Sequence, residues 1–324
     1  MSLTAIILAA GKSTRMKSSL PKPLHEVCGR PMLAYILDAA FEAGADKAVL
    51  VVGHGKEQVV DAFAKNDDRV DWVEQKQQLG TGHAVMTAVP KLPESGDVIV
   101  LAGDLPLIRG ESLKELLKQH RETGAAVSMA TAEVPDPFGY GRVIRDGNGE
   151  FVKIVEQADA SPEEAAVREV FPSITLGTVA GLKAALDQLG NDNAQGEYYF
   201  TDVFELTKQA GGKVTAVSCI EADDIVAPNN RQQLADAGRV MQGRIQARHF
   251  ADGVGIPSPE TTYIEFGATI GQDTTVMPFS FIGGKAAIGA NCTIGPFGHV
   301  ARGGVVRDGQ TVTGNAGVQA SPGA

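Results

Sequence analysis

The feature that most restricts the fold of this chain is a six-residue repeat near its carboxyl end. From residue 264 onward an aliphatic residue returns at every sixth position, and a small residue stands two positions before most of them. The aliphatic positions are Ile264, Ile270, Val276, Ile282, Ile288, Ile294, Val300, Val306, Val312 and Val318. The small positions are Ala268, Thr274, Ser280, Ala286, Cys292, Gly298, Gly304 and Ala316. A strict period of six is typical of a left-handed parallel β-helix, in which aliphatic side chains fill triangular coils and small residues allow the corners. A β-sandwich has no reason to keep this period, so we predict a short β-helix of about three coils.

The β-helix also implies association of the chain with copies of itself. Each coil buries its faces only against the next coil, and an open terminal coil exposes unpaired strand edges unless it is capped or paired. Because the coil is triangular, we expect a homotrimer formed through this region.

The preceding part of the chain alternates between apolar runs and amphipathic helical stretches. Unbroken apolar runs over residues 5–8, 49–52 and 98–101 are typical of strands that are buried on both faces of a sheet. An apolar stripe with helical spacing runs over residues 33–40 and is followed by a glycine that can end the helix. A D-G-N-G turn within residues 142–155 predicts a hairpin in the same domain. Helices and strands in this order predict an α/β fold with a mixed sheet.

The pattern changes again before the repeat begins. Residues 230–250 are polar and helical, with no strand signal. We therefore expect an α/β domain over residues 1–229, a connecting helix over 230–255 and the β-helix over 256–324.

Composition and charge narrow the class of ligand. No apolar run approaches the ~20 residues of a membrane-spanning helix, and the apolar start lacks the basic segment of a signal peptide. Three scattered cysteines favour neither disulfides nor a zinc cluster, so we expect a cytoplasmic protein. The net charge of −10 argues against nucleic-acid binding. Residues 1–30 nevertheless hold five basic side chains against one acidic, a balance of +4, which suits a small anionic ligand.

The basic island coincides with the most informative motif, L-A-A-G-K-S-T-R-M over residues 8–16 and L-P-K-P-L over 20–24. It leaves the end of the first predicted strand, where open α/β sheets bind ligands. Ala9, Ala10 and Gly11 keep the backbone bare, so its N–H groups can approach a phosphate or a base. Arg15 and Lys22 supply positive charge for phosphate oxygens. The spacing matches neither a Walker A loop nor a dinucleotide fingerprint.

This motif resembles the signature of sugar-1-phosphate nucleotidyltransferases, L-A-A-G-x-G-T-R-M…P-K, with Ser13 in place of the second glycine. Six further segments strengthen the resemblance: Q-K-Q-Q-L-G-T-G-H-A (75–84), L-A-G-D-L-P-L (101–107), G-Y-G-R (139–142), I-V-E (154–156), N-A-Q-G-E-Y-Y (193–199) and N-N-R (229–231). Together they are similar to the bacterial bifunctional N-acetylglucosamine-1-phosphate uridylyltransferase/glucosamine-1-phosphate acetyltransferase family. The resemblance covers about residues 4–250 in order, and the β-helix is similar in type. It implies a Rossmann-like nucleotidyltransferase domain.

The implied reaction is Mg²⁺-dependent uridylyl transfer from UTP to N-acetylglucosamine 1-phosphate or a related sugar 1-phosphate, with release of pyrophosphate. Two anions must be brought together, so charge neutralisation and positioning are the main requirements. Asp104 ends a predicted strand and could hold Mg²⁺, which takes few protein oxygens. The resemblance adds Asn229 as the second metal ligand and implies catalytic roles for Arg15 and Lys22. It implies substrate-binding roles for Leu8, Ala9, Ala10, Gly11, Gln75, Gly80, Thr81, Gly103, Gly141 and Glu156.

Structural interpretations stay open for several of these residues. Asp104 could be a helix N-cap, Glu156 a surface charge of a hairpin, and Asn229 the beginning of the connecting helix. His25, His54 and His83 are more often structural than catalytic at such positions, and the anionic nucleophile of this reaction needs no strong base.

Two departures from the family pattern affect the interpretation. The family has E-[IV]-N-[TS]-G where this chain has Glu169, Val170, Phe171, Pro172 and Ser173. The exchange removes a side chain that can bond the sugar, so selectivity among sugars should fall or change. The acetyl-coenzyme A site of the family lies on a longer β-helix, so we expect the short one to be structural or trimerising rather than an acetyltransferase.

Two other hypotheses remain. The chain could transfer a nucleotide to a different sugar, or it could be a nucleotide-sugar-binding scaffold with little catalysis. A pure binder gains little from a metal ligand at the α-phosphate, so Arg15, Lys22 and Asp104 favour the enzyme.

Overall fold

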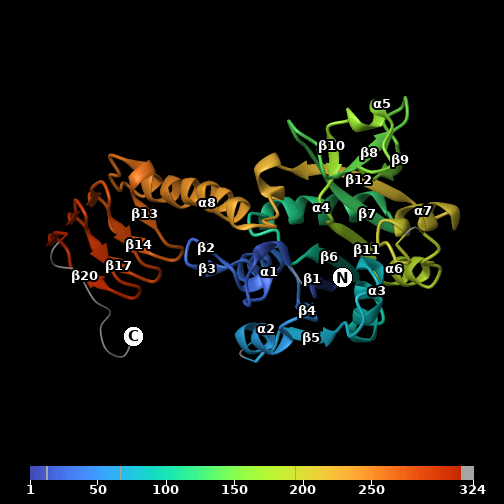
Figure 1. Ribbon diagram of the computed structural model, residues 1–324, viewed down its shortest axis with the longest axis horizontal. Coiled ribbons are helices and arrows are strands. Elements are labelled where there is room, and N and C mark those ends of the chain that lie inside the picture. Colours follow the sequence, from blue (N-terminus) through green and yellow to red (C-terminus); the bar gives the residue numbers. More distant parts are fainter. Residues whose placement is uncertain (12–13, 66, 194, 315–324) are drawn as a thin grey trace. The chain divides into compact units, whose positions relative to one another are not determined.

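The computed structural model describes residues 1–11, 14–65, 67–193 and 195–314, and it divides into two compact units. The first, here called the α/β unit, holds Met1–His25 and Met32–Asn230. The second, here called the β-helical unit, holds Glu26–Pro31 and Arg231–Ala324, of which residues 231–314 are described (Figure 1). Ser13 and the repeat positions Ala316 and Val318 lie outside the described residues. Among the residues described, no helix is both long and apolar enough to cross a membrane.

A ten-stranded mixed sheet forms the centre of the α/β unit. Its order is β5-β4-β1-β6-β11-β7-β10-β8-β9, and β12 also pairs with β7. The strands are β1 (Leu3–Ala9), β4 (Lys47–Val52), β5 (Val70–Glu74), β6 (Asp97–Ala102), β7 (Val127–Glu133), β8 (Gly141–Arg145), β9 (Phe151–Val155), β10 (Glu169–Phe171), β11 (Thr175–Thr178) and β12 (Val214–Ile220). Strands β5, β4, β1 and β6 are parallel, whereas β11 is antiparallel to both of its neighbours. The predicted α/β class, the mixed sheet and the hairpin are confirmed, the last as β8 and β9.

Helices cover both faces of this sheet because successive strand side chains point to opposite sides. In β1, Ala5 and Ile7 join a core that includes residues of α1, α2 and α4, while Ile6 joins the core beneath α3, α6 and α7. The helices are α1 (Met32–Glu42), α2 (Lys56–Phe63), α3 (Thr81–Ala88), α4 (Gly110–Thr123), α5 (Pro162–Ala165), α6 (Val179–Leu186) and α7 (Asp202–Gln209). Short 3₁₀ turns are η1 (Thr14–Met16), η2 (Lys22–Leu24), η3 (Val89–Lys91) and η4 (Ala222–Ile225).

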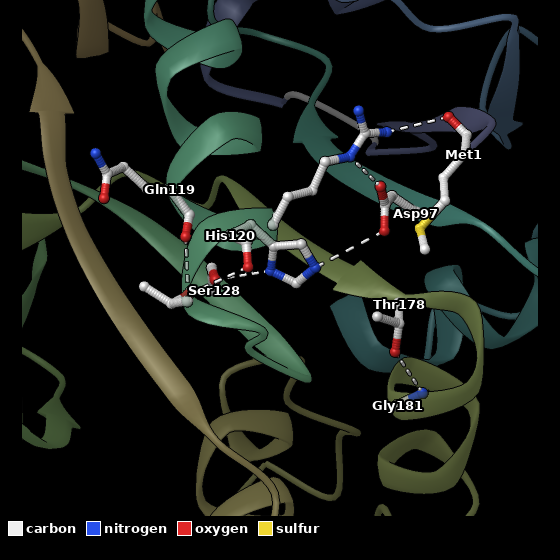
Figure 2. Close-up of polar contacts among 9 residues, drawn as sticks. Met1, Asp97, Gln119, His120, Ser128, Thr178 and Gly181 are labelled. Carbon is white, nitrogen blue, oxygen red and sulfur yellow. Dashed lines mark hydrogen bonds and ion pairs between the residues drawn. The ribbon is translucent and has the colours of Figure 1, made fainter.

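A buried polar contact attaches α4 to the sheet (Figure 2). The Nδ1 atom of His120 in α4 lies 2.8 Å from the hydroxyl of Ser128 in β7. Its Nε2 atom lies 3.9 Å from a carboxylate oxygen of Asp97, and Arg121 donates to the other oxygen at 2.8 Å. Ser, His and Asp here form an interior contact, since each of the three is 2 % exposed or less.

The β-helical unit follows the six-residue period. Its strands are β13 (Tyr263–Ile264), β14 (Thr269–Ile270), β15 (Thr275–Val276), β16 (Phe281–Ile282), β17 (Ala287–Ile288), β18 (Thr293–Ile294), β19 (His299–Val300), β20 (Val305–Val306) and β21 (Thr311–Val312). They form three parallel sheets in which each strand pairs with one three positions later in the order, so that Ile264 lies beside Ile282. The aliphatic residue of every described hexapeptide is buried, at 7 % exposure or less. The predicted left-handed β-helix is therefore confirmed.

Two further segments pack in the β-helical unit: the hairpin of β2 (Glu26–Val27) and β3 (Arg30–Pro31), and α8 (Arg231–Ala251). The hairpin lies within the range 1–229 predicted for the first domain, but its contacts are with the second unit. Arg302 binds both Glu26 and the buried Glu265, at 2.9 Å and 2.6 Å. The turn residue Gly29 has φ +78°, and an added Cβ would come within 2.4 Å of the Glu265 side chain.

Candidate active site

A cleft of 430 Å³ opens at the carboxyl ends of β1 and β6, the edge at which open α/β sheets bind ligands. Twelve of the fourteen residues predicted for the site line it: Leu8, Ala9, Ala10, Gly11, Arg15, Lys22, Gln75, Gly80, Thr81, Gly103, Asp104 and Asn229. The other two, Gly141 and Glu156, line an adjoining cavity. The structure thus gathers residues from most of the length of the α/β unit, while their roles remain predictions.

Charged and amide groups converge at the centre of this cleft. The Lys22 ammonium group is buried and contacts both the Asp104 carboxylate and the Asn229 side-chain oxygen, the latter at 2.8 Å. Arg15 donates to the same Asn229 oxygen at 3.0 Å. Each group lies at the end of a different element: Lys22 begins η2, Asp104 follows β6, and Asn229 precedes α8. The arrangement offers two cations to an incoming anion and two oxygens to a metal.

These contacts bear on the structural interpretations of Asp104 and Asn229. Asp104 does not cap the following helix, because α4 begins at Gly110 with Arg109 at its N-cap position. Asn229 directs its side-chain oxygen at Lys22 and Arg15, so it does more than begin α8.

The donor set fits Mg²⁺. Asp104 and Asn229 direct their oxygens at one ammonium group, which marks a point of convergence for a cation. Mg²⁺ prefers oxygen ligands, and it often takes only one or two from the protein and completes its shell with phosphates and water. The described residues contain no group of three or more His, Cys, Asp or Glu side chains that could hold a metal. A Mg²⁺ site shared with substrate phosphates is compatible with this pair.

The walls of the cleft are close backbone contacts that only small residues permit. A Cβ on Gly103 would lie 2.6 Å from the Leu8 carbonyl oxygen, and one on Gly80 would lie 2.5 Å from the Tyr198 carbonyl oxygen. Gly80 also has φ +104°, a conformation that side chains disfavour. The fold itself therefore requires glycine beside β1 and before α3.

Polar side chains fix the loop before α3. The buried Gln75 amide lies 3.1 Å from both the Gly80 carbonyl oxygen and the His83 Nδ1 atom. Gln78 donates to the Ala10 carbonyl oxygen at 2.6 Å and lines the cleft. The sequence prediction named Gln75 but omitted Gln78, although both lie in the Q-K-Q-Q segment. His83 supports Gln75, in keeping with the structural role expected for it.

The adjoining cavity, of 310 Å³, shares Ala102, Asp104 and Ser173 with the main cleft. Gly141 lies in its wall, where a Cβ would come within 3.5 Å of a Glu156 carboxylate oxygen. Loss of solvent around the carboxyl group raises the pKa of Glu156, Asp159 raises it further, and Arg142 opposes both. The Glu156 residue is nevertheless exposed, so its carboxylate lines the cavity from the surface of the hairpin and can accept a hydrogen bond from a ligand there.

The segment that departs from the family pattern also lines this cavity. Glu169 is fixed by Arg145 and by the Thr131 hydroxyl, both at 2.6 Å, so β10 keeps its place. The Phe171 ring is 6 % exposed and packs edge-on against Phe204, with ring centroids 5.3 Å apart. Ser173 has φ +61°, where the family has glycine. At position 171 the cavity is therefore lined by an aromatic ring, on a strand that the Glu169 contacts hold in place.

Comparisons with known proteins agree with the geometry. Residues 5–168 match the MobA-like NTP transferase domain, and residues 267–302 match the bacterial transferase hexapeptide family (six repeats). The "Bifunctional protein GlmU" of Caldanaerobacter subterraneus is 46 % identical over 294 residues, which are 91 % of this chain and 64 % of that protein. The protein of the same name from Pelobacter propionicus is 47 % identical over 293 residues, or 90 % of this chain and 64 % of that protein.

One solved structure supports the fold. A UDP-glucose pyrophosphorylase complexed with UDP-glucose has a TM-score of 0.61 and 18 % sequence identity, and the match covers 75 % of this chain and all of that one. At this identity the likeness concerns the fold alone. This chain spans slightly less than two thirds of the length of its curated relatives.

Proposed function

Since this chain belongs to the family of the bifunctional GlmU proteins, with a MobA-like NTP transferase domain followed by hexapeptide repeats, we propose that it is a sugar-1-phosphate nucleotidyltransferase. Its reaction is uridylyl transfer from UTP to N-acetylglucosamine 1-phosphate, which yields the UDP-sugar and pyrophosphate. The observation that supports this best is the convergence of Lys22, Arg15, Asp104 and Asn229 in one cleft. We restrict the proposal to this activity, because the chain spans only 64 % of its relatives.

The chemistry follows from charge. The sugar phosphate oxygen attacks the α-phosphorus of UTP, and the bond to the pyrophosphate breaks as the new P–O bond forms. Both reactants are anions, so fixed positive charge is required where negative charge gathers. Lys22 and Arg15 supply it from two sides of Asn229. Asp104 and Asn229 would hold Mg²⁺, which supplies further positive charge at the phosphate oxygens.

The remaining residues orient the substrates. Leu8, Ala9, Ala10 and Gly11 present a bare backbone to the nucleotide, and Gln75, Gly80 and Thr81 form the opposite wall for the uracil. Gly103 leaves room between β1 and β6. Gly141 and Glu156 line the adjoining cavity, which we assign to the sugar.

The proposal is tested by pyrophosphate release from UTP and N-acetylglucosamine 1-phosphate with Mg²⁺. We expect release by the wild type and its near loss in Asp104→Ala. Asp61→Ala, which changes an aspartate of α2 outside both cavities, should behave as the wild type. Release that survives in Asp104→Ala would contradict the assigned metal site, and no release from any sugar 1-phosphate would favour the nucleotide-sugar-binding scaffold.

A second candidate substrate follows from the apolar wall at Phe171. The loss of a hydrogen-bonding side chain there favours weaker discrimination among sugars. A panel of sugar 1-phosphates in the same assay separates the two. Faster pyrophosphate release with another sugar 1-phosphate would support the same reaction but assign it a different sugar substrate.

We further propose that the chain forms a homotrimer through the β-helical unit and acts in the cytoplasm. The hexapeptide match supports oligomerisation, and Cys28, Cys219 and Cys292 are free thiols, as expected in a reducing compartment. Light scattering should give about three times the 33.9 kDa chain mass. A mass of one or two chains would exclude the trimer.

A further inference from the structure

The β8–β9 hairpin contains a buried guanidinium group beside the cavity assigned to the sugar. Arg142, in β8, is 1 % exposed. Its two terminal nitrogens donate to the Tyr140 carbonyl oxygen and to the Gln157 side-chain oxygen, the latter at 2.6 Å. Among the described residues no carboxylate accepts a hydrogen bond from it, and its Nε atom has no partner.

A buried arginine without a paired carboxylate is costly, because the charge loses its hydration. Glu156 lies near enough to feel this charge but forms no hydrogen bond with it. An apolar side chain at position 142 would fill the interior without that cost. Burial alone therefore does not account for an arginine at this position, and its hydrogen bonds carry the argument.

What Arg142 and Gln157 hold is the rim of the cavity. The Gln157 side-chain oxygen accepts from Arg142 and also from the Gly139 backbone N–H, at 3.0 Å. Gly139, Tyr140 and Gly141 line one side of the cavity, and Glu156, the residue before Gln157, lines another. One carboxamide oxygen thus ties together the two backbone segments between which the sugar is proposed to bind.

The same network reaches a third segment of the cavity lining. The Tyr140 hydroxyl donates to the Ile225 carbonyl oxygen at 3.2 Å, and Ile225 and Ala227 line the cavity as well. Tyr140 is therefore held at its carbonyl by Arg142 and at its hydroxyl by the segment that leads to Asn229.

We propose that Arg142 and Gln157 are positioning residues that set the shape of the sugar-binding cavity without touching the sugar. The inference rests on the proposed function, because it takes this cavity as the sugar site. Neither residue lines the cavity itself, so each acts through Gly139, Tyr140 and Glu156.

Equilibrium binding tests the proposal without turnover. UDP and UDP-N-acetylglucosamine are titrated separately into the full chain, since only the second ligand fills the sugar cavity. In Gln157→Ala we expect the Kd of UDP-N-acetylglucosamine to rise about tenfold and the Kd of UDP to stay within about twofold, an effect typical of a lost site-orienting contact. Gln157→Glu keeps an acceptor for Arg142 and Gly139 and should restore the Kd to within about threefold of the wild type.

Arg142→Lys provides a second variant, in which the Kd of UDP-N-acetylglucosamine should again rise more than the Kd of UDP. Lysine keeps the positive charge, but it cannot donate to both acceptors because it lacks the planar guanidinium fork. Arg168→Lys is the matched control, since Arg168 donates to the Val134 carbonyl oxygen, away from the cavity. An unchanged Kd for UDP-N-acetylglucosamine in Gln157→Ala would overturn the proposal, and so would an equal rise in the Kd values of both ligands. A wild type that binds neither ligand would instead contradict the proposed function.

Discussion

The two units of this protein assemble their interiors over very different distances along the chain. In the β-helical unit Ile264 lies beside Ile282, eighteen positions later, and every further coil repeats that spacing. In the α/β unit Lys22 meets Asp104, 82 positions later, and Asn229, 207 positions later. The β-helical unit shows that a short sequence period can by itself specify which residues are buried. The α/β unit shows that a site can depend on contacts between residues far apart in the sequence, which no local pattern predicts.

The two units also differ in what a side chain contributes. An interior aliphatic residue of the β-helix contributes by being buried, and any one of them has equivalent neighbours above and below. A residue of the cleft contributes by its charge at one point, and no equivalent residue replaces it. The predictions below test that contrast, beginning with the largest effect.

Lys22→Ala should lower the rate of pyrophosphate release by about 10²–10³-fold, the loss typical of one electrostatic donor at a reaction centre. The free energy of unfolding should change by only about 1 kcal/mol, since Lys22 is buried but the Asp104 side chain is 28 % exposed and stays partly hydrated when it loses its partner. Lys56→Ala is the matched control, because Lys56 forms an ion pair with Glu74 at 2.8 Å outside the cleft. An equal loss of rate in the two variants would contradict the assigned catalytic role of Lys22.

Ile282→Ala should destabilise the β-helical unit by about 3 kcal/mol, because it leaves a cavity in a coil where Ile282 is fully buried. Thr293→Ala, at an exposed strand position, should change stability by less than about 0.5 kcal/mol. Urea unfolding followed by circular dichroism measures both variants. Trp72, the single tryptophan, reports on the α/β unit by fluorescence. If Thr293→Ala cost as much as Ile282→Ala, the six-residue period would not define the interior.

Gly29→Ala should destabilise its unit by about 2 kcal/mol, since the new Cβ meets Glu265 and the backbone is left-handed. Gly44→Ala, which ends α1 at φ +102° with open space around it, should cost about 1 kcal/mol. The two values, measured by the same urea titration, separate a steric cost from a backbone cost. An equal loss in both would show that contact with Glu265 adds nothing.

The smallest expected effect is a dependence of stability on pH through His120 and His249, one in each unit. Burial lowers the pKa of both below the ordinary 6.5; for His120, Asp97 opposes this shift and Arg121 adds to it. Near pH 6.5 and below, the unfolded chain therefore binds protons that the folded chain does not. The free energy of unfolding has its full value above pH 6.5 and decreases as the pH falls below 6.5. The urea midpoint should be lower at pH 5.5 than at pH 8, and His120→Gln should reduce that difference. A midpoint that rises on acidification would refute the sign.

Several elements could be predicted from the sequence for identifiable physical reasons. The strands over residues 5–8, 49–52 and 98–101 were visible because both of their faces are buried, so that the apolar run is unbroken. The structure extends each of them by only two or three residues, to Leu3–Ala9, Lys47–Val52 and Asp97–Ala102. The motif at residues 8–11 was visible from its run of small residues, although an added Cβ at Gly11 would meet nothing within 4 Å, so packing within the fold does not require that glycine.

Other features left no local signal. Gln157 is an ordinary polar residue after a strand, and only its contacts with Arg142 and Gly139 distinguish it. The hairpin of Glu26–Pro31 looks like part of the first domain, because nothing near it in the sequence names its partners Arg302 and Glu265. Phe171 was visible as a departure, but not its packing against Phe204.

By itself, the sequence determined the repeating interior of the β-helical unit and the strands and bare loops of the α/β unit. In each of these, burial or close backbone approach restricts residue type at a fixed spacing, so the restriction is written along the chain. Tertiary structure alone decided which distant side chains meet: Lys22 with Asp104 and Asn229, Arg142 with Gln157, and Arg302 with Glu26. The order of the strands and the path of the loops bring those groups together, and polar groups that meet in this way need keep no period in the sequence.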